Sequence, residues 1–576
     1  MNTLVIVLIA AVVLVCAYAG YGRWLAKTWG VDPNAKTPAV RLEDGKDYVP
    51  TNGWTVFAHQ FSSIAGAGPV TGAIQAAAFG WLPVLLWVLI GGVFFGAVTD
   101  FGALYASVKN DGKSMGLLIE KYIGKTGRKL FLLFCWLFCG IVIAAFADMV
   151  AGTFNAFDAE GAQVEAAFTN GAAGMVSIMF MVFAVVFGFI QKKFNFSGWK
   201  EAVIGIAFIV LSFVVGMNAP IILGKTGWSY ITFVYIFFAA VLPMWMLKQP
   251  RDYMTTFMFG AMIAGAVIGL LVAHPTMNLP VFTGFNNAKL GTMFPILFVT
   301  VACGAVSGFH SLVSSGTSSK TVENEKDMLK VGYGAMVLES LLAVLALCVA
   351  GAAAAADGTP AAGTPFQIFS RGVAGFFEMF GVPVSIATVF MTMCVSALAL
   401  TSLDAVARIG RMSFQELFSV DDMEHAEGWR KLCCNIYFST FITLVFGFIL
   451  TQIGYANIRP LFGSANQLLS ALVLATLCVF LKVTGRNNKM LFPPLVIMLC
   501  VTFTALVQRL IAMVKAISAA ASTAIPAGET TWGAVFIANG LQLILAVLLI
   551  VLGLNIVFHS VKSYTTCDAP EAKVTV

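Results

Sequence analysis

Long runs of apolar residues, separated by short polar segments, recur along the whole chain. A helix needs about 20 mostly apolar residues to cross a hydrocarbon core, and about fifteen stretches approach that length. Their pattern lacks the two-residue alternation of an outer-membrane barrel strand, so the spans are predicted to be helices. They centre on residues 3–20, 54–78, 81–106, 130–155, 173–191, 200–217, 229–247, 253–273, 293–318, 331–351, 383–403, 430–452, 464–482, 490–512 and 532–557.

The composition agrees with this pattern. Apolar residues make up 59% of the 576 positions and charged residues 11%, and the mean hydropathy is +0.88. A soluble domain carries about 25% charged residues, so a soluble enzyme, a disordered chain and a nucleic-acid binder are excluded. The sequence also lacks a P-loop and a nucleophile signature, so neither an ATP-driven pump nor an enzyme is expected.

The basic residues are distributed unevenly between the predicted loops. If the N-terminus is outside and residues 3–20 form an uncleaved anchor, 28 of the 34 Lys and Arg residues fall on the cytoplasmic side. This bias predicts fifteen spans with a cytoplasmic C-terminus. It also predicts an anchor and cytoplasmic loop at 1–53 and a cytoplasmic tail at 558–576.

Two of the stretches, 54–78 and 299–320, are poor continuous helices because Gly, Ser and Pro crowd into them. Pro69 removes a backbone donor and disfavours a helical Gly68, which leaves upstream carbonyls without partners. Unwound backbone in a membrane can line a cavity and bind a carboxylate or a cation. The alternative is close packing between helices at small residues.

The candidate substrate-binding residues lie at these two breaks. Their hydroxyl and imidazole groups, together with free backbone groups, are suited to a small polar solute. The first break contributes His59, Ser62, Ser63, Gly66, Gly68 and Pro69, and the second contributes Gly304, Ser307, Gly308, His310 and Ser314. Each His can titrate near neutral pH or donate to a substrate carboxylate, or can instead be a packing residue.

The order of elements predicts two inverted repeats, over 54–273 and 293–557. Each begins with a broken span, followed by an ordinary span and an amphipathic segment, at 107–129 and 363–381. By the alternation of loops the two repeats have opposite topology. Inverted repeats with paired broken helices are typical of alternating-access transporters.

Ionisable groups inside spans are costly and therefore candidates for ion coupling. Glu339 is the best candidate for a proton carrier, whereas Asp100 and Asp148 lie near span ends and can also reach interfacial water. Asp404 and Arg408, at i and i+4, are expected to pair as a cytoplasmic cap. Thr401 and Ser402, one turn inward, could join unwound carbonyls around Na⁺. No cofactor or metal is expected, and the coupling ion is left open between H⁺ and Na⁺.

Several segments resemble the carbon starvation protein A family, over most of residues 40–485. They are DGKDYVPTN at 44–52, FAHQF at 57–61, IAGAGP at 64–69, GWLP at 80–83, GAVTDF at 96–101, DGKS at 111–114, CGAVSGFH at 303–310, SGTSSK at 315–320 and TSLD at 401–404. The chain departs from the family where Gln60 stands, a position at which a second His is frequent.

The resemblance implies an inner-membrane secondary transporter, induced when carbon is scarce, for small peptides or, in some members, pyruvate. It also implies a core of the LeuT-like, amino acid–polyamine–cation type, with a seven-plus-seven fold as the alternative. The leading hypothesis is an ion-coupled peptide symporter in the lipid bilayer. A pyruvate or small-carboxylate symporter, a passive channel and a nutrient sensor are the alternatives, and the oligomeric state is open.

Overall fold

The computed structural model describes residues 2–45, 47–158, 160–194, 198–243, 245–288, 290–420, 427–522 and 532–567. Residues 568–576 of the predicted tail lie outside this range. The described chain is almost entirely helical. Its two strands, β1 (Asn286–Asn287) and β2 (Gly291–Thr292), form one short antiparallel pair in which Asn286 is opposite Thr292.

Eleven helices in the described residues are long and apolar enough to cross a membrane, or twelve if one bent pair counts as a single span. Every one of the predicted stretches overlaps a helix, although the full number of spans stays a prediction. The α-helices are α1 (Thr3–Ala17), α2 (Arg23–Trp29), α3 (Pro38–Arg41), α4 (Gly53–Ile64), α5 (Gly68–Ala76), α6 (Trp81–Gly91), α7 (Ala97–Val108), α8 (Met115–Tyr122), α9 (Lys125–Phe154), α10 (Ala167–Phe194), α11 (Trp199–Asn218), α12 (Lys225–Val241), α13 (Lys248–Ala273), α14 (Met293–Thr300), α15 (Gly308–Gly316), α16 (Ala335–Ala353), α17 (Pro365–Glu378), α18 (Val384–Phe418), α19 (Gly428–Cys434), α20 (Ile436–Thr451), α21 (Tyr455–Val483), α22 (Phe492–Ser522) and α23 (Trp532–Thr566).

Several shorter helical turns connect or extend these helices. Tighter 3₁₀ turns are η2 (Ala77–Phe79), η4 (Ser318–Lys320), η5 (Glu325–Asp327) and η7 (Lys489–Leu491), and wider π turns are η1 (Tyr18–Gly22), η3 (Gly92–Gly96) and η6 (Leu329–Gly334). The three π turns lie within otherwise continuous helices, between α1 and α2, between α6 and α7, and before α16. Such π turns are rare in proteins overall, and those that occur are often found at functional sites.

Both stretches that were predicted to break are interrupted. In the first span α4 ends at Ile64 and α5 begins at Gly68, with Pro69 in its first turn. In the second, α14 ends at Thr300 and α15 begins at Gly308, so seven residues of irregular backbone separate the two halves. These bounds confirm that the Gly, Ser and Pro residues divide each span near its middle.

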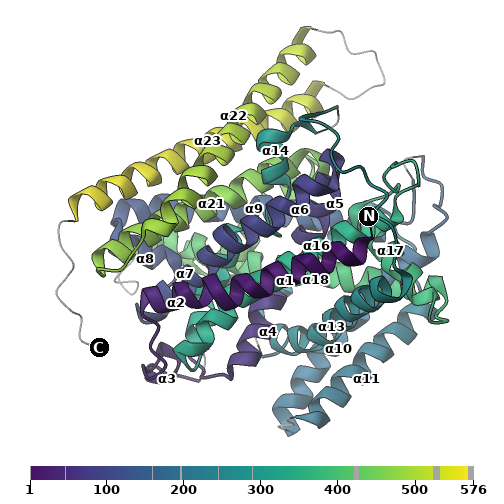
Figure 1. Cartoon of the computed structure of the whole chain (residues 1–576), viewed down its shortest axis with the longest axis horizontal. Helices are drawn as coiled ribbons and strands as arrows, with labels where there is room; N and C mark the ends of the chain where they lie inside the picture. The colour runs from purple at the N-terminus through teal and green to yellow at the C-terminus, as the bar shows by residue number, and fades with distance from the viewer. Residues whose placement is uncertain are drawn as a thin grey trace.

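The helices form a bundle in which α9, α16, α18 and α21 are the most buried long helices (Figure 1). Helix α9 packs along α18, and α21 is buried over its whole apolar window. Helices α22 and α23 run side by side along one edge, and α10 and α11 pair along another (Figure 1). The two broken spans therefore lie inside the bundle, where unwound backbone is shielded from lipid.

Candidate functional site: two broken spans and their buried charges

The break in the first span is in direct contact with α18. Ala65 leaves the helical conformation with a ψ of 66°, and the N–H of Gly66 donates to the carbonyl of Ile64 at 2.6 Å. The Ser402 hydroxyl lies against Gly66 so closely that a Cβ there would collide with it. The hydroxyls of Thr401 and Ser402 are both buried without a hydrogen-bond partner among the described residues. The first break, the carbonyl end of α4 and the Ser402 oxygen therefore share one polar region, and Thr401 precedes Ser402 in α18.

The two breaks also pack directly on each other. The backbone of Gly68 lies against the Cys303 side chain with no room for a Cβ, and Gly304 lies against Pro69 and Ala343. A Cβ on Gly72, one turn further along α5, would lie 2.6 Å from the Thr300 carbonyl oxygen. Only glycine lets backbone approach this closely. The structure thus brings most of the predicted substrate-binding residues into one region, where they are buried.

Gln60 joins α4, the N-terminal half of the first broken span, to the second broken span. Its Nε2 donates to Ser314 Oγ at 2.8 Å, and its Oε1 accepts from Ser318 Oγ at 2.6 Å. All three side chains are buried. Because the amide has both a donor and an acceptor, it satisfies two hydroxyls of the neighbouring span at once. The residue that departs from the family pattern therefore has a defined role in this chain.

Asn466 on α21 satisfies the second break. Its Oδ1 accepts from the Phe309 N–H at 3.2 Å, and its Nδ2 donates to Ser307 Oγ at 3.0 Å and contacts Cys303 Sγ at 3.4 Å. Nearby, Gln467 Nε2 donates to the Phe298 carbonyl of α14 at 2.7 Å. These amides replace helix bonds that the irregular segment cannot make. The pair of adjacent amides in the stretch 464–482 was the sequence signal for this role, and sequence reasoning missed it.

A completely buried triad of ionisable residues lies beside the second break. His310 Nδ1 is 3.1 Å from Asp100 Oδ2, and His310 Nε2 is 3.4 Å from Glu339 Oε2. The three side chains are each 0% exposed and come from α15, α7 and α16. Both carboxylate oxygens of Glu339 and Oδ1 of Asp100 have no hydrogen-bond partner among the described residues. One imidazole between two carboxylates is an arrangement that can hold and release a proton.

The π turns position two members of this triad. The turn η3 comes just before the segment that carries Asp100, and η6 comes just before α16, which carries Glu339. Gly332 of η6 packs on the backbone of Phe101, next to Asp100. The sequence predicted that Asp100 could reach interfacial water. That prediction is wrong, because the fold buries Asp100 completely against His310.

A second buried cluster surrounds Arg251 at the start of α13. Its guanidinium donates to Tyr235 Oη of α12 at 2.6 Å and to Asp252 Oδ1 at 2.6 Å, and it contacts Asp404 Oδ2 of α18. Tyr235 Oη in turn donates to Asp404 Oδ2 at 2.7 Å. We call these four residues the arginine cluster. It ties three helices together through one buried cation and two carboxylates.

The pairing predicted between Asp404 and Arg408 is wrong. Asp404 belongs to the arginine cluster, and Arg408 donates to the carbonyls of Ala239 and Leu242, the latter at 2.8 Å. Arg408 therefore covers the C-terminal end of α12, where carbonyls lack helical partners. Asp404 therefore pairs with Arg251 of α13 and not with Arg408, which lies one turn further along α18.

His59 lies at the edge of this cluster rather than with His310. Its Nδ1 is 3.8 Å from Asp252 Oδ2, and its side chain is 38% exposed. Lys248 and Arg251, which the sequence placed in a cytoplasmic loop, are buried within the first turn of α13. The two predicted histidines of the breaks therefore occupy separate sites, one buried and one accessible.

The remaining predicted residues are placed as follows. Asp148 on α9 forms an ion pair with Lys225 at 2.7 Å, near the end of its helix and away from the triad. Ser62 donates to the His59 carbonyl at 3.2 Å, and Ser63 is buried close to the break. Gly308 packs on the backbone of Ser470 in α21.

Among the described residues no group of three His, Cys, Asp or Glu side chains has the geometry of a metal site.

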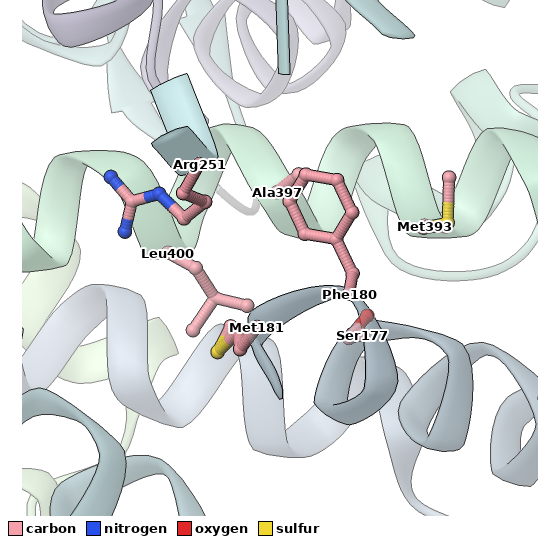
Figure 2. Close-up of a pocket in the computed structure, with 7 residues that line it drawn as sticks. All are labelled: Ser177, Phe180, Met181, Arg251, Met393, Ala397 and Leu400. Atoms are coloured by element: carbon pink, nitrogen blue, oxygen red, sulfur yellow. The ribbon is translucent and has the colours of Figure 1, made fainter. Parts of the chain in front are cut away.

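Arg251 also lines a small cavity between α10 and α18 (Figure 2). The cavity measures about 10 Å³, which is room for about one water molecule. Its other walls are largely apolar, as Figure 2 shows for Phe180, Met181 and Leu400. The Nε of Arg251 is buried and has no hydrogen-bond partner among the described residues.

Long apolar helices, two interrupted spans and buried ionisable clusters define a multi-pass α-helical membrane protein. The family model described as carbon starvation protein CstA matches residues 2–362 and 352–505. This chain belongs to the carbon starvation protein CstA family.

Three relatives illustrate the similarity. The chain is 36% identical to the peptide transporter CstA of Escherichia coli, over 60% of this chain and 50% of the relative. It is 36% identical to the pyruvate/proton symporter BtsT of the same organism, over 61% and 49% of the two chains. It is 30% identical to the peptide transporter CstA of Bacillus subtilis, over 85% and 87%. The chain therefore spans about half the length of the E. coli relatives and most of the Bacillus one.

Two solved transporter structures align with most of this chain at low sequence identity. The manganese transporter of Eremococcus coleocola, in complex with an aromatic bis-isothiourea compound, is 11% identical and aligns over 91% of this chain and 99% of its own, with a TM-score of 0.49. MhsT in complex with L-phenylalanine is 12% identical and aligns over 88% and 99%, with a TM-score of 0.45.

Proposed function

We propose that this chain is a proton-coupled symporter that imports small peptides across the inner membrane by alternating access. The observation that carries the proposal is the triad of Asp100, His310 and Glu339, which is fully buried beside a broken span. Burying a charge in the membrane costs free energy, so the ionisable groups found there are typically functional. Intramembrane acid–imidazole groups are typical of proton relays. Glu339 is the proton carrier in this proposal, and His310 links its protonation to Asp100.

The substrate site in this proposal lies between the two breaks, at 62–69 and 304–314. The start of α5 presents backbone N–H groups that can bind a carboxylate, since the positive end of a helix attracts anions. The triad lies against the same second break, because His310 is in the first turn of α15, three residues after Ser307. Substrate binding and protonation can therefore affect each other through the position of α15.

The alternating-access core is proposed to consist of the two inverted repeats at 54–273 and 293–557. The observed order of elements supports this proposal, because a broken span, a helix with a π turn and a short amphipathic helix occur once in each half. The amphipathic helices are α8 and α17. The Lys and Arg distribution supports an N-terminus outside and a C-terminus in the cytoplasm, and this orientation is part of the proposal.

Two observations favour a second substrate and a second coupling ion. The relative BtsT is named a pyruvate/proton symporter and is as similar to this chain as the E. coli peptide transporter. Pyruvate is therefore the second candidate substrate. The unpartnered hydroxyl of Ser402 beside Gly66, together with that of the adjacent Thr401, favours Na⁺ as a second candidate ion, since hard cations bind oxygen ligands.

The test is uptake of labelled dialanine and of labelled pyruvate into proteoliposomes, driven separately by an inward proton gradient and by an inward Na⁺ gradient. We expect dialanine to accumulate with the proton gradient and to leak out when a protonophore is added. If Na⁺ alone drives accumulation, the coupling site is the pair Thr401 and Ser402 and not the triad. Equilibration without accumulation under either gradient would make the protein a channel and reject the proposal.

A further inference from the structure

A large cavity with several polar side chains in its wall opens at one end of the bundle, apart from the two breaks. It measures about 710 Å³, within the usual range for small-molecule sites. Four elements surround it: the C-terminal end of α9, the N-terminal end of α10, the middle of α17 and the first turns of α18. We call this cavity the vestibule. With the N-terminus outside, as the Lys and Arg distribution predicts, the vestibule faces the external solution.

The vestibule carries one charge of each sign. Arg371 on α17 and Glu165, just before α10, both line it and are both exposed. Neither forms an ion pair with another described residue, so both charges are available to a solute. The N-termini of α10 and α18 also end at the vestibule, and their partial positive charge favours an anion near them.

A buried hydroxyl points to a bound solute. Ser370, next to Arg371, is 1% exposed and lines the vestibule, and its Oγ has no hydrogen-bond partner among the described residues. A buried hydroxyl without a partner costs free energy, so a ligand that supplies one stabilises the site. Thr388 and Thr392 of α18 extend this polar wall inward.

The small cavity beside Arg251 lies further along α18 than the vestibule. Thr392 lines the inner part of the vestibule, and Met393, Ala397 and Leu400 on the next turns of α18 line the small cavity (Figure 2). Asp404, one turn further, belongs to the arginine cluster. Successive turns of α18 therefore line the vestibule, then the small cavity, and then reach the arginine cluster.

We infer that the vestibule is an outer recognition site for short peptides, in which Arg371 binds the terminal carboxylate and Glu165 binds the terminal ammonium group. Ser370 donates a further hydrogen bond to the carboxylate end. The inference rests on the proposed function for the direction of transport, and it adds the chemical class of solute that the protein admits. That class is a small zwitterion with separated charges.

Glu165 distinguishes this solute from a simple anion. A monocarboxylate such as pyruvate would be attracted by Arg371 but repelled by Glu165, whereas a peptide can pair with both. Charge-assisted hydrogen bonds are about twice as strong as neutral ones, so each pair contributes measurably even at a wet site. Removal of the Glu165 charge is therefore expected to weaken peptide binding and to strengthen pyruvate binding, whereas removal of the Arg371 charge should weaken both.

The experiment measures binding and uptake separately with the full chain. Binding of dialanine, acetyl-dialanine, dialanine amide and pyruvate to the purified protein is measured by calorimetry, and uptake is measured in proteoliposomes. For Arg371→Gln we expect about tenfold weaker binding of dialanine but little change for dialanine amide. For Glu165→Gln we expect about tenfold weaker binding of dialanine, little change for acetyl-dialanine and tighter binding of pyruvate.

The matched controls are Glu378→Gln and Lys515→Gln, which remove exposed charges of the same two signs and do not line the vestibule. Both controls should bind all four compounds like the unmodified protein. Equal losses for capped and uncapped peptides, or weaker pyruvate binding in Glu165→Gln, would overturn the inference. If binding follows the expected pattern while uptake is absent, the recognition site stands and the proposed transport function fails.

Discussion

The imidazole Nε2 of His310 lies 3.4 Å from the carboxylate Oε2 of Glu339, and neither side chain is exposed at all. The opposite ring nitrogen faces Asp100 at 3.1 Å. Two buried carboxylates on one imidazole cannot all remain charged without a large cost in free energy. The relationship therefore makes the protonation of Glu339 sensitive to any movement of α15.

The first prediction concerns coupling. Glu339→Gln keeps the size of the side chain but cannot exchange a proton, so accumulation driven by a pH gradient should be lost. A gradient of one pH unit is worth about 1.4 kcal/mol and can drive up to ~10-fold accumulation. The variant should equilibrate dialanine instead. Uptake is measured against Glu378→Gln as the control, and undiminished accumulation in Glu339→Gln would exclude Glu339 as the carrier.

The second prediction concerns stability. His310→Leu leaves Asp100 and Glu339 buried without a cation, a loss that typically costs about 3–5 kcal/mol. The Tm should fall markedly at neutral pH, and the deficit should shrink as the pH falls because the carboxylates bind protons. His310→Leu/Glu339→Leu should lose less than the two single variants combined. Additive losses that do not depend on pH would contradict direct contact within the triad.

The third prediction tests the packing of the two breaks. Gly68→Ala places a Cβ on the Cys303 side chain and should abolish uptake and lower the Tm, since overpacking typically costs about 1–3 kcal/mol. Gly68→Ala/Cys303→Gly removes the obstructing atoms and should recover both properties in part. The control is Gly260→Ala, where a Cβ meets no neighbour. A Gly68→Ala variant with full uptake would remove the basis for a site at this contact.

The fourth prediction concerns the connection made by Gln60. Gln60→Leu deprives Ser314 and Ser318 of their partner and should destabilise the protein by about 1–3 kcal/mol. Gln163→Leu, an exposed loop substitution, is the control. Thermal unfolding in detergent measures the difference. Identical Tm values for the two variants would mean that these hydrogen bonds do not hold the spans together.

The fifth prediction separates the arginine cluster from ordinary packing. Arg251→Leu leaves Asp252 and Asp404 unpaired and should greatly reduce the folded yield. Adding Asp404→Asn should restore part of it, because one of the two uncompensated charges is removed. Arg411→Leu, which removes a cation that donates to the Ala240 carbonyl, is the comparison. No recovery in the double variant would show that Arg251 acts through its packing alone.

Much of this arrangement could be predicted from local chemistry. Pro69 and the crowded Gly and Ser residues act on their own backbone, so the positions of both breaks follow from short segments of sequence. Glu339 stood out for the same reason, because a lone acid within an apolar run is unusual wherever the run is packed.

The partners of these residues could not be predicted, because they depend on contacts between distant helices. Asp100 lies near the end of its predicted span, but α15 packs over it in the folded protein. The i,i+4 rule predicts Arg408 as the partner of Asp404, whereas the fold pairs Asp404 with Arg251. Arg251 was counted with a loop because α13 begins five residues before the predicted span. Spacing rules identify possible partners within one helix, whereas the burial of a side chain depends on which other helices pack against it.

The two halves of the first broken span are held by different kinds of force. Helix α5 interlocks with the second break at backbone distance, as Gly68 and Gly72 require, and such contacts cannot slide without collision. Helix α4 is joined to α15 and η4, beyond that break, by the hydrogen bonds of Gln60 with Ser314 and Ser318, which water or a solute can replace. In the proposed alternating-access cycle, residues 65–67 would therefore act as a joint, about which α4 tilts with exchange of these hydrogen bonds while α5 stays packed on the second break.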